Sequence, residues 1–238
     1  MKIPAKLIRV TAELVSAMKC SSITIVPTND DWSIYSMDPS HTVIAYTKFE
    51  RDLFTDFSKD AAFTIDCAKF INSLKLTESN ETSLEISGNR VVLSGNGMKS
   101  KIPLLEYEES ARKFPDLSPD TLAQVDIELF RKLIKASDAT KNDQIKIVID
   151  ENGFFASDEN DEGVGNTIQV TADECALLEG EAKAYFGTSL FQELIGCIPK
   201  DQIVDFCMST DMPLTMKWSG EHWSAKLLIA PRIVDEEE

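Results

Sequence analysis

The chain has 238 residues, 43% of them hydrophobic, which is enough for one large domain or two ordinary ones and excludes global disorder. No apolar run is long enough to cross a membrane, and the first residues lack the apolar core of a secretory signal. The formal net charge of -16 argues against a protein that binds nucleic acid through a basic patch.

Four stretches place apolar residues at the spacing of an amphipathic helix. They cover residues 11–20, 66–76, 126–138 and 188–200, and each begins with Thr or Asp, residue types that cap helix N-termini. The last three share apolar or small residues at i, i+3, i+4 and i+7, namely Cys67, Phe70, Ile71 and Leu74; Phe130, Leu133, Ile134 and Ser137; and Phe191, Leu194, Ile195 and Ile198. We therefore predict four helices, each with one buried face.

Short runs typical of β-strands follow every predicted helix. They cover residues 23–26, 32–36 and 42–46; 83–87, 90–94 and 99–104; 144–149 and 154–157; and 203–209, 213–218 and 223–230. Asn152-Gly153, between two of these runs, is a strong hairpin signal. The repeating unit is therefore one helix followed by several mostly antiparallel strands, used four times.

The spacing of the helices along the chain indicates an internal duplication. We predict an α+β protein of two similar domains, at residues 1–104 and 123–234. A connecting loop at residues 105–122 joins them, and an acidic tail follows at residues 235–238. The loop is acidic and contains Pro115 and Pro119, as expected of an extended linker.

The acidic excess avoids the predicted helices. They contain seven basic and six acidic residues, and four of the acids lie in first turns, where the helix dipole favours negative charge. Because helix surfaces are often rich in lysine, charge alone leaves two interpretations open. One is ordinary solvation. The other is that four polar faces turn toward a polyanion, while salt screens the acidic exterior over about 8 Å.

Three motifs favour the second interpretation: Ser36-Met37-Asp38-Pro39-Ser40-His41, Met-Ser-Thr-Asp-Met-Pro-Leu at 208–214, and Leu-Ile-Ala-Pro-Arg-Ile at 228–233. Together with the repeat and the linker they resemble, over essentially the whole chain, the proliferating-cell-nuclear-antigen (PCNA) family of sliding clamps of the archaeal and eukaryotic type. The resemblance implies the DNA clamp, or processivity, fold: a homotrimeric ring with helices inside and sheet outside. It also implies a non-catalytic processivity factor for DNA replication and repair that encircles double-stranded DNA.

The resemblance assigns three sets of residues by position. The DNA-facing set is Lys19, Lys69, Lys75, Arg131, Lys132 and Lys135. The set that docks partner peptides of the form Q-x-x-[apolar]-x-x-aromatic-aromatic, the PIP box, is Met37, His41, Leu104, Phe114, Pro115, Pro213, Leu228, Ala230, Pro231 and Ile233. The subunit-interface set is Lys99, Ser100, Lys101 and Ile102 on one chain and Thr167, Ile168, Gln169 and Val170 on the next.

Two helices depart from the family pattern. Positions where basic residues are common hold Ala12 and Glu13 in the first helix and Ser189, Gln192, Glu193 and Gly196 in the fourth. The hole is therefore expected to be less positive than usual. The implied partners are DNA polymerase, the clamp loader, a flap nuclease and a ligase. The implied location is the cytoplasm or nucleoid of an archaeon, which we favour, or a eukaryotic nucleus.

Catalysis finds little support, and no catalytic, cofactor or metal site is expected. The chain has only two histidines, His41 and His222, and no Gly-rich phosphate loop or nucleophile elbow. Residues 158–163 resemble the start of a calcium loop, but Gln169 stands where that loop needs Glu. The five scattered cysteines are expected to be reduced thiols. Alternatives are a subunit of a heterotrimeric clamp, a monomeric acidic interaction module and, less favoured, an enzyme with a carboxylate pair.

Overall fold

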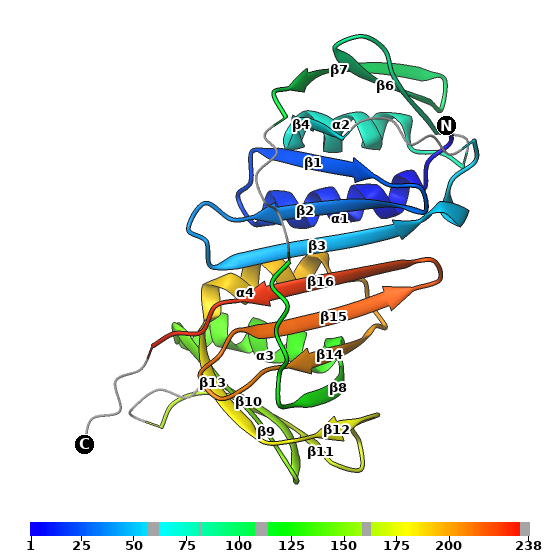
Figure 1. Ribbon diagram of the computed structural model, residues 1–238. Coiled ribbons are helices and arrows are strands. Elements are labelled where there is room, and N and C mark those ends of the chain that lie inside the picture. The colour runs from blue at the N-terminus through cyan, green and yellow to red at the C-terminus, as the bar shows by residue number, and fades with distance from the viewer. Residues whose placement is uncertain (57–61, 81, 108–113, 159–162, 234–238) are drawn as a thin grey trace. The chain divides into compact units, whose positions relative to one another are not determined.

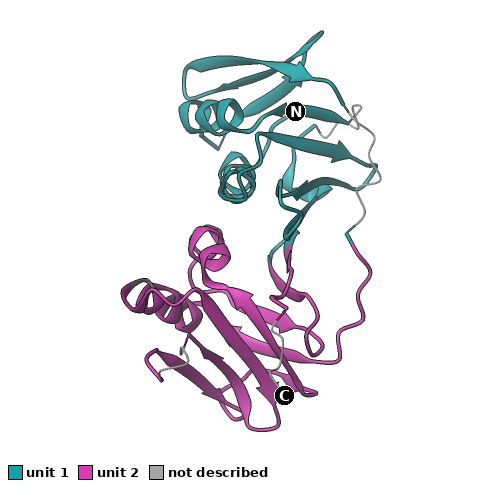
Figure 2. Ribbon diagram, turned by 90° about the vertical axis from the view of Figure 1, so that its left-hand side faces the viewer, with its two compact units in different colours: residues 1–114, 219–225 teal, residues 115–218, 226–238 magenta. Residues whose placement is uncertain are grey.

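The computed structural model describes residues 1–56, 62–80, 82–107, 114–158 and 163–233. The chain forms two compact units, unit 1 (residues 1–114 and 219–225) and unit 2 (residues 115–218 and 226–238), shown in Figure 1 and Figure 2. Part of the predicted connecting loop, most of the calcium-like segment and the acidic tail lie outside the described residues. None of the helices in the described ranges has the length and apolar character that a membrane span requires.

Unit 1 combines a helix pair with one antiparallel sheet. The helices are α1 (Ala5–Ala17) and α2 (Cys67–Thr77), with a short 3-10 helix, η1 (Arg51–Leu53). The strand order is β3-β2-β1-β4-β7-β6-β5. Their bounds in chain order are β1 (Ser22–Pro27), β2 (Asp31–Met37), β3 (Val43–Glu50), β4 (Phe63–Asp66), β5 (Ser83–Ile86), β6 (Arg90–Gly95) and β7 (Met98–Leu105). The two helices pack together on one side of the strands (Figure 2).

Unit 2 has a second helix pair and two groups of strands. The helices are α3 (Ile127–Thr140) and α4 (Thr188–Leu194), with η2 (Ile195–Cys197) continuing from α4. The strand orders are β12-β8-β14-β15-β16 and β11-β10-β9-β13. Their bounds are β8 (Leu122–Asp126), β9 (Gln144–Asp150), β10 (Gly153–Ser157), β11 (Thr167–Thr171), β12 (Leu178–Glu179), β13 (Ala182–Gly187), β14 (Ile203–Cys207), β15 (Leu214–Gly220) and β16 (Trp223–Ile229).

The order of elements repeats one unit four times. The repeats are α1-β1-β2-β3, α2-β5-β6-β7, α3-β9-β10-β11 and α4-β14-β15-β16. This arrangement confirms the predicted α+β fold of helix-plus-antiparallel-strand repeats. Strands β4, β8, β12 and β13 were not predicted from the sequence. β4, β8 and β13 each lead directly into a helix, so no turn residues mark their ends.

Aspartate caps set the starts of α2 and α3 as predicted. The Asp66 carboxylate accepts a hydrogen bond from the backbone N–H of Lys69 at 2.8 Å, and the Asp126 carboxylate accepts one from the N–H of Glu128 at 2.9 Å. Each cap satisfies one of the unpaired N–H groups of a first helical turn.

The predicted bounds of the other two helices are wrong. α1 begins at Ala5, behind Pro4, rather than at Thr11, because the buried Ala5 and Ile8 extend its apolar face toward the N-terminus. The fourth helix is capped by Gly187 rather than by Thr188. It ends at Leu194 and tightens into η2, so it does not continue to residue 200.

The predicted apolar faces of α2, α3 and the fourth helical segment are confirmed, because all their i, i+3, i+4 and i+7 positions are buried. In unit 2 the ring of Phe130 lies 5.1 Å from that of Phe191 and 5.2 Å from that of Phe206, in edge-to-face contacts that fix how α3 packs on its neighbours. All five cysteines lie within the described ranges and are free thiols, with Cys67 and Cys207 buried.

Candidate functional site

Charged side chains on the helices of each unit are the first candidates for a functional surface. Within the helix bounds the basic residues outnumber the acidic ones, although the whole chain has a net charge of -16. The bases are Lys6, Arg9, Lys69, Lys75, Arg131, Lys132 and Lys135, and the acids are Glu13, Glu128, Asp138 and Glu193. The acidic excess therefore lies on the strands, turns and termini.

Two of the predicted DNA-facing lysines lie on α2. The side chain of Lys69 is 65% exposed, with its Nζ 3.9 Å from the Asp66 carboxylate. The side chain of Lys75 is 54% exposed, with its Nζ 3.2 Å from the carboxylate of Glu13 on α1. Both ammonium groups thus keep access to solvent, and ion pairs between exposed groups are weak.

A charge network joins α1 to α2. The Arg9 guanidinium donates to Glu78 at 2.6 Å and to Glu13 at 2.9 Å, and Glu13 is also the partner of Lys75. The network has two positive and two negative members, so it adds no net charge to this surface. Glu13, which departs from the family pattern, therefore compensates the neighbouring cations.

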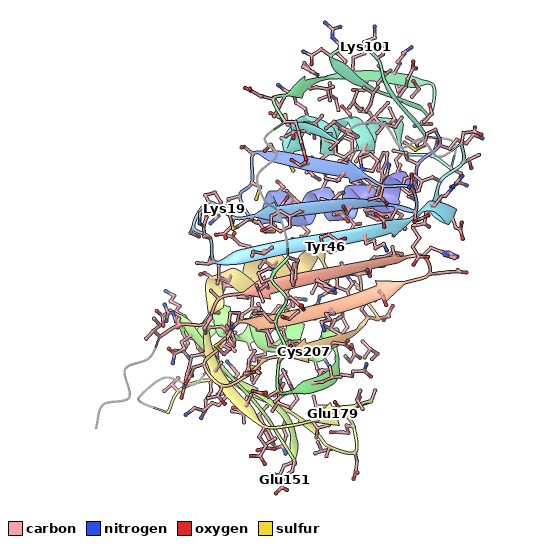
Figure 3. All side chains as sticks on the ribbon, in the orientation of Figure 1. Lys19, Tyr46, Lys101, Glu151, Glu179 and Cys207 are labelled. Atoms are coloured by element: carbon pink, nitrogen blue, oxygen red, sulfur yellow. The ribbon has the colours of Figure 1, made fainter. Side chains whose placement is uncertain are left out.

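The helical position of Lys19 was predicted wrongly. α1 ends at Ala17, and Lys19 is an exposed residue of the following turn, with φ of 61° (Figure 3). By contrast, Lys6 and Arg9 lie on α1 and were missed because the helix start was set too late. Pro4 was the available signal, since proline is favoured at helix starts.

Arg131 also differs from its prediction as a DNA-facing residue, because it is only 8% exposed. Its guanidinium donates to the carbonyl oxygen of Ile195 at 3.0 and 3.2 Å and also to that of Ile198, and it pairs with Glu128. These carbonyls end the fourth helical segment, where cations are favoured. Arg131 therefore joins α3 to the end of that segment inside unit 2.

Lys132 and Lys135, the other predicted positions on α3, are exposed. They are three residues apart, so they lie on the same helix face. Because buried residues of α3 occupy the opposite face, this exposed face is the part of unit 2 that best fits a phosphate contact.

In unit 1 the predicted peptide-docking residues are Met37, His41, Leu104 and Phe114. Met37 ends β2 and is 39% exposed, and His41 is an exposed turn residue with φ of 59°. Leu104 is half-buried on β7, and the Phe114 ring lies 6.3 Å from the ring of Tyr46 on β3. Unit 1 thus offers Met37 and His41 at one turn, Leu104 near the end of β7 and Phe114 within the connecting loop.

The turn between β2 and β3 is held by Asp38, which is 7% exposed. Its carboxylate accepts from the N–H of Thr42 at 2.7 Å and of Val43 at 2.6 Å, and from Ser40. Burial raises the pKa of Asp38, but the hydrogen bonds from Ser40, Val43 and Thr42 outweigh it and hold the pKa below its usual value. The ionised carboxylate therefore fixes the turn that presents Met37 and His41.

Asp38→Asn is expected to lower the free energy of unfolding by about 2 kcal/mol at pH 7, because the amide cannot accept all of these hydrogen bonds. A depressed folded-state pKa stabilises the fold above the unfolded pKa, and that stabilisation is lost as pH falls through the folded pKa. Urea unfolding across pH 7 to 3 should therefore show the difference between the two proteins shrinking toward acid. The exposed Asp30→Asn is the control, and a difference independent of pH would contradict the assignment.

In unit 2 the predicted docking residues differ in exposure. Pro115, Pro213, Ala230 and Pro231 are half-buried, Leu228 is 7% exposed and Ile233 is 94% exposed. Leu228 therefore packs in unit 2 and presents little surface, whereas almost the whole Ile233 side chain is available to a partner.

Each predicted interface strand has at least part of one edge without a neighbouring strand in the described chain. β11 is the last strand of the order β11-β10-β9-β13, with Thr167 and Gln169 exposed, Ile168 half-buried and Val170 buried. β7 pairs with β6 over residues 98–103 but with β4 only at Leu104 and Leu105.

Within the described chain, one edge of β7 at residues 98–103 therefore has no strand beside it. On this segment Lys99 and Lys101 are exposed, and Figure 3 shows Lys101 projecting outward. Ile102 is buried, and Ser100 is hydrogen-bonded to Ser73 on α2 at 2.6 Å. Both edges could thus accept another strand.

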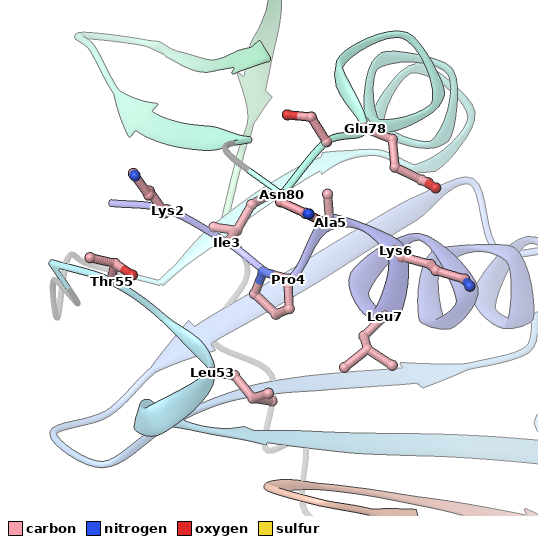
Figure 4. Close-up of a pocket in the computed structure, with 11 residues that line it drawn as sticks. Lys2, Ile3, Pro4, Ala5, Lys6, Leu7, Leu53, Thr55, Glu78 and Asn80 are labelled. Atoms are coloured by element: carbon pink, nitrogen blue, oxygen red, sulfur yellow. The ribbon is translucent and has the colours of Figure 1, made fainter. Parts of the chain in front are cut away.

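A cavity of about 490 Å³ opens in unit 1 at the start of α1 (Figure 4). Its walls include Lys2, Lys6, Leu7, Leu53, Thr55 and Glu78. It contains none of the residues that the sequence assigns to DNA, peptides or the subunit interface. The candidate sites are therefore surfaces rather than this cavity.

Comparisons with known proteins agree on one type of protein. The chain is 25% identical over 223 residues to a DNA polymerase sliding clamp of Pyrococcus horikoshii, covering 87% of each chain. Its structure is similar to A. fulgidus PCNA bound to the C-terminal region of FEN-1, with a TM-score of 0.87, 19% identity and 98% of each chain covered. It is also similar to the PCNA2-PCNA3 complex of Sulfolobus tokodaii, with a TM-score of 0.80, 19% identity and 97% and 98% covered. No family profile matches the chain.

Proposed function

We propose that the chain is a DNA sliding clamp of the PCNA family, and that copies of it close into a ring around double-stranded DNA and tether replication and repair enzymes there. It is a processivity factor rather than a catalyst. The observation that carries the proposal is the fourfold helix-plus-three-strand repeat across the whole chain, which is the architecture of this fold.

Topological binding reconciles the charge of the chain with its ligand. A protein with a net charge of -16 would bind DNA poorly if it held the duplex only by contacts on one side. A closed ring needs only weak, sequence-independent contacts, which the exposed lysines of α2 and α3 can provide locally. We propose that Lys69, Lys75, Lys132 and Lys135 supply them, joined by Lys6 on α1.

Reversing two charges tests the DNA-facing surface. Lys132→Glu with Lys135→Glu is expected to reduce clamp-dependent stimulation of a DNA polymerase by roughly fivefold or more at moderate salt, because two phosphate contacts become repulsive. Lys146→Glu, on the exposed face of β9, is a control for charge loss and is compared with Lys132→Glu alone. Unchanged stimulation by the double variant would count against this face of α3.

We propose that partner enzymes dock through a short peptide ending in two aromatic residues. An aromatic pair needs apolar surface that it can desolvate; Met37 and Phe114 offer such surface in unit 1, and Pro213, Pro231 and Ile233 offer it in unit 2. The linker and residues 230–233 can add backbone hydrogen bonds to an extended peptide. DNA polymerase, a clamp loader, a flap nuclease and a ligase are the partners expected, and the C-terminal region of FEN-1 bound to A. fulgidus PCNA supports this mode.

We propose that β7 of one chain pairs with β11 of the next, since each strand has an uncovered edge and closure of the ring would cover it. Light scattering on the purified chain tests this, and a trimer mass is expected. The S. tokodaii complex makes a heteromeric clamp the second candidate. A monomer that forms a ring only with a different clamp chain would favour that candidate.

We also propose that the two units correspond to domains 1–104 and 123–234, joined by residues 105–122, with an acidic tail at 235–238. Because the relatives named above are archaeal, we place the protein with the DNA in the nucleoid region of an archaeal cell rather than in a nucleus.

A further inference from the structure

We propose that Arg232 is a positioning residue for partner docking, because it ties down the segment that follows β16 and so presents Ile233 in one place. The inference rests on the docking role proposed above for Ile233. It concerns unit 2 alone, since Arg232, Ile233 and the groups that hold them all belong to that unit.

The segment after β16 has few means of holding its own position. β16 ends at Ile229, and residues 230–233 continue without strand structure. Pro231 has no N–H to donate. Ile233 is 94% exposed, so its own packing contributes little to fixing it. Apart from the partial burial of Ala230 and Pro231, the place of Ile233 is therefore set by the residue before it.

Arg232 makes two hydrogen bonds to different elements of unit 2. Its backbone N–H donates to the carbonyl oxygen of Tyr185 on β13 at 2.6 Å. Its guanidinium donates to the carboxylate of Asp143, in the turn between α3 and β9, at 2.8 Å. Main chain and side chain are thus held at separate points, which restrains both the position and the direction of the segment.

Asp143, which accepts the hydrogen bond from the Arg232 side chain, is itself held in place. The Asp143 carbonyl accepts from the N–H of Thr188 at 3.0 Å, where β9 and β13 end their pairing at Gln144 and Gly187. A Cβ on Gly187 would lie 3.9 Å from the Arg232 Nε, so the guanidinium lies close to this glycine. The hydrogen bond from Arg232 also lowers the pKa of Asp143, which keeps this carboxylate ionised.

The contribution should appear in binding rather than in folding. The side chains of Arg232 and Asp143 are 42% and 79% exposed, so the ion pair adds little to the stability of the unit. Ordering a chain segment before the partner arrives removes a cost that binding would otherwise bear. Loss of Arg232 should therefore weaken docking while leaving thermal unfolding nearly unchanged.

The test is calorimetric titration of the full chain with a synthetic peptide containing Q-x-x-L-x-x-F-F. Arg232→Ala and Asp143→Asn are each expected to weaken binding about three- to tenfold, and the double variant no more than the stronger single one. Arg232→Lys should restore part of the affinity, because an ammonium can still reach the carboxylate. Circular-dichroism melting of each variant checks that the fold is retained.

The decisive measurement repeats Arg232→Ala in an Ile233→Ala background. If Arg232 acts by presenting Ile233, its removal should then cost almost nothing further, whereas a general structural role would cost the same in both backgrounds. Full affinity in Arg232→Ala, with weakened binding in Ile233→Ala, would overturn the inference and leave the docking surface intact. Full affinity in Ile233→Ala and Phe114→Ala would overturn the docking proposal, and the inference with it.

Discussion

Arg131→Met is expected to lower the free energy of unfolding by about 3 kcal/mol, because it removes the guanidinium donor from two buried carbonyl groups, and the Ile195 carbonyl keeps only the N–H of Ile198 at 3.4 Å. The side chain is 8% exposed, and its guanidinium satisfies the Ile195 and Ile198 carbonyls at the end of the fourth helical segment. Methionine fills a similar volume, so the loss reports mainly on hydrogen bonding. The contact with Glu128 adds less, because that carboxylate is 40% exposed and regains water.

Urea unfolding at a fixed chain concentration measures this effect, since subunit association would otherwise shift the apparent stability. Lys132→Met is the matched control, because Lys132 is the next residue of α3 and is exposed. It should change the free energy of unfolding by no more than about 0.5 kcal/mol. A loss below about 1 kcal/mol in Arg131→Met would mean that water replaces the guanidinium at these carbonyls.

Phe114→Ala combined with Ile233→Ala is expected to weaken a peptide of the Q-x-x-[apolar]-x-x-aromatic-aromatic type by at least about 2 kcal/mol, or roughly thirtyfold in affinity. Apolar anchors that pack against aromatic side chains usually contribute most of the energy of such interfaces. The Ile233 side chain is 94% exposed, so truncating it leaves no cavity in the folded chain. A loss of affinity in Ile233→Ala alone would therefore report on docking rather than on stability, whereas the half-buried Phe114, whose ring lies 6.3 Å from that of Tyr46, requires a melting curve of the double variant as a check.

Isothermal titration calorimetry with the wild-type and double-variant chains provides the measurement. Ile203→Ala is a matched control, since Ile203 is 51% exposed on β14 and lies outside the predicted docking set. The same affinity in all three proteins would refute the docking assignment.

The fold could be predicted wherever local signals and apolar periodicity agreed. Asp66 and Asp126 precede clear apolar repeats, so α2 and α3 were placed to within two residues at each end. The start of α1 has no capping side chain, and Pro4 is its only sequence mark. The fourth helix ended early although its apolar spacing continued to Ile198, because η2 keeps similar residues buried in a tighter turn.

The candidate surfaces were harder to predict than the fold, because a charge count does not say which way a side chain points. Lys132 and Lys135 are exposed as expected. Arg131 beside them is buried, and its guanidinium is hydrogen-bonded to carbonyl groups of the fourth helical segment. That contact joins residues 64 and 67 positions apart, which no local pattern reveals. The same holds for Arg9, whose partner Glu78 comes from the far end of α2.

The neutral network of Arg9, Glu13, Lys75 and Glu78 has a consequence for movement along DNA. Counterions condense on the DNA, and a cation already paired with a carboxylate displaces fewer of them than a free cation would, so the phosphate contacts of Arg9 and Lys75 should be weak. This part of the helix pair of unit 1 should then slide along DNA with little resistance, and the contribution of Arg9 and Lys75 to one-dimensional diffusion should depend only weakly on ionic strength.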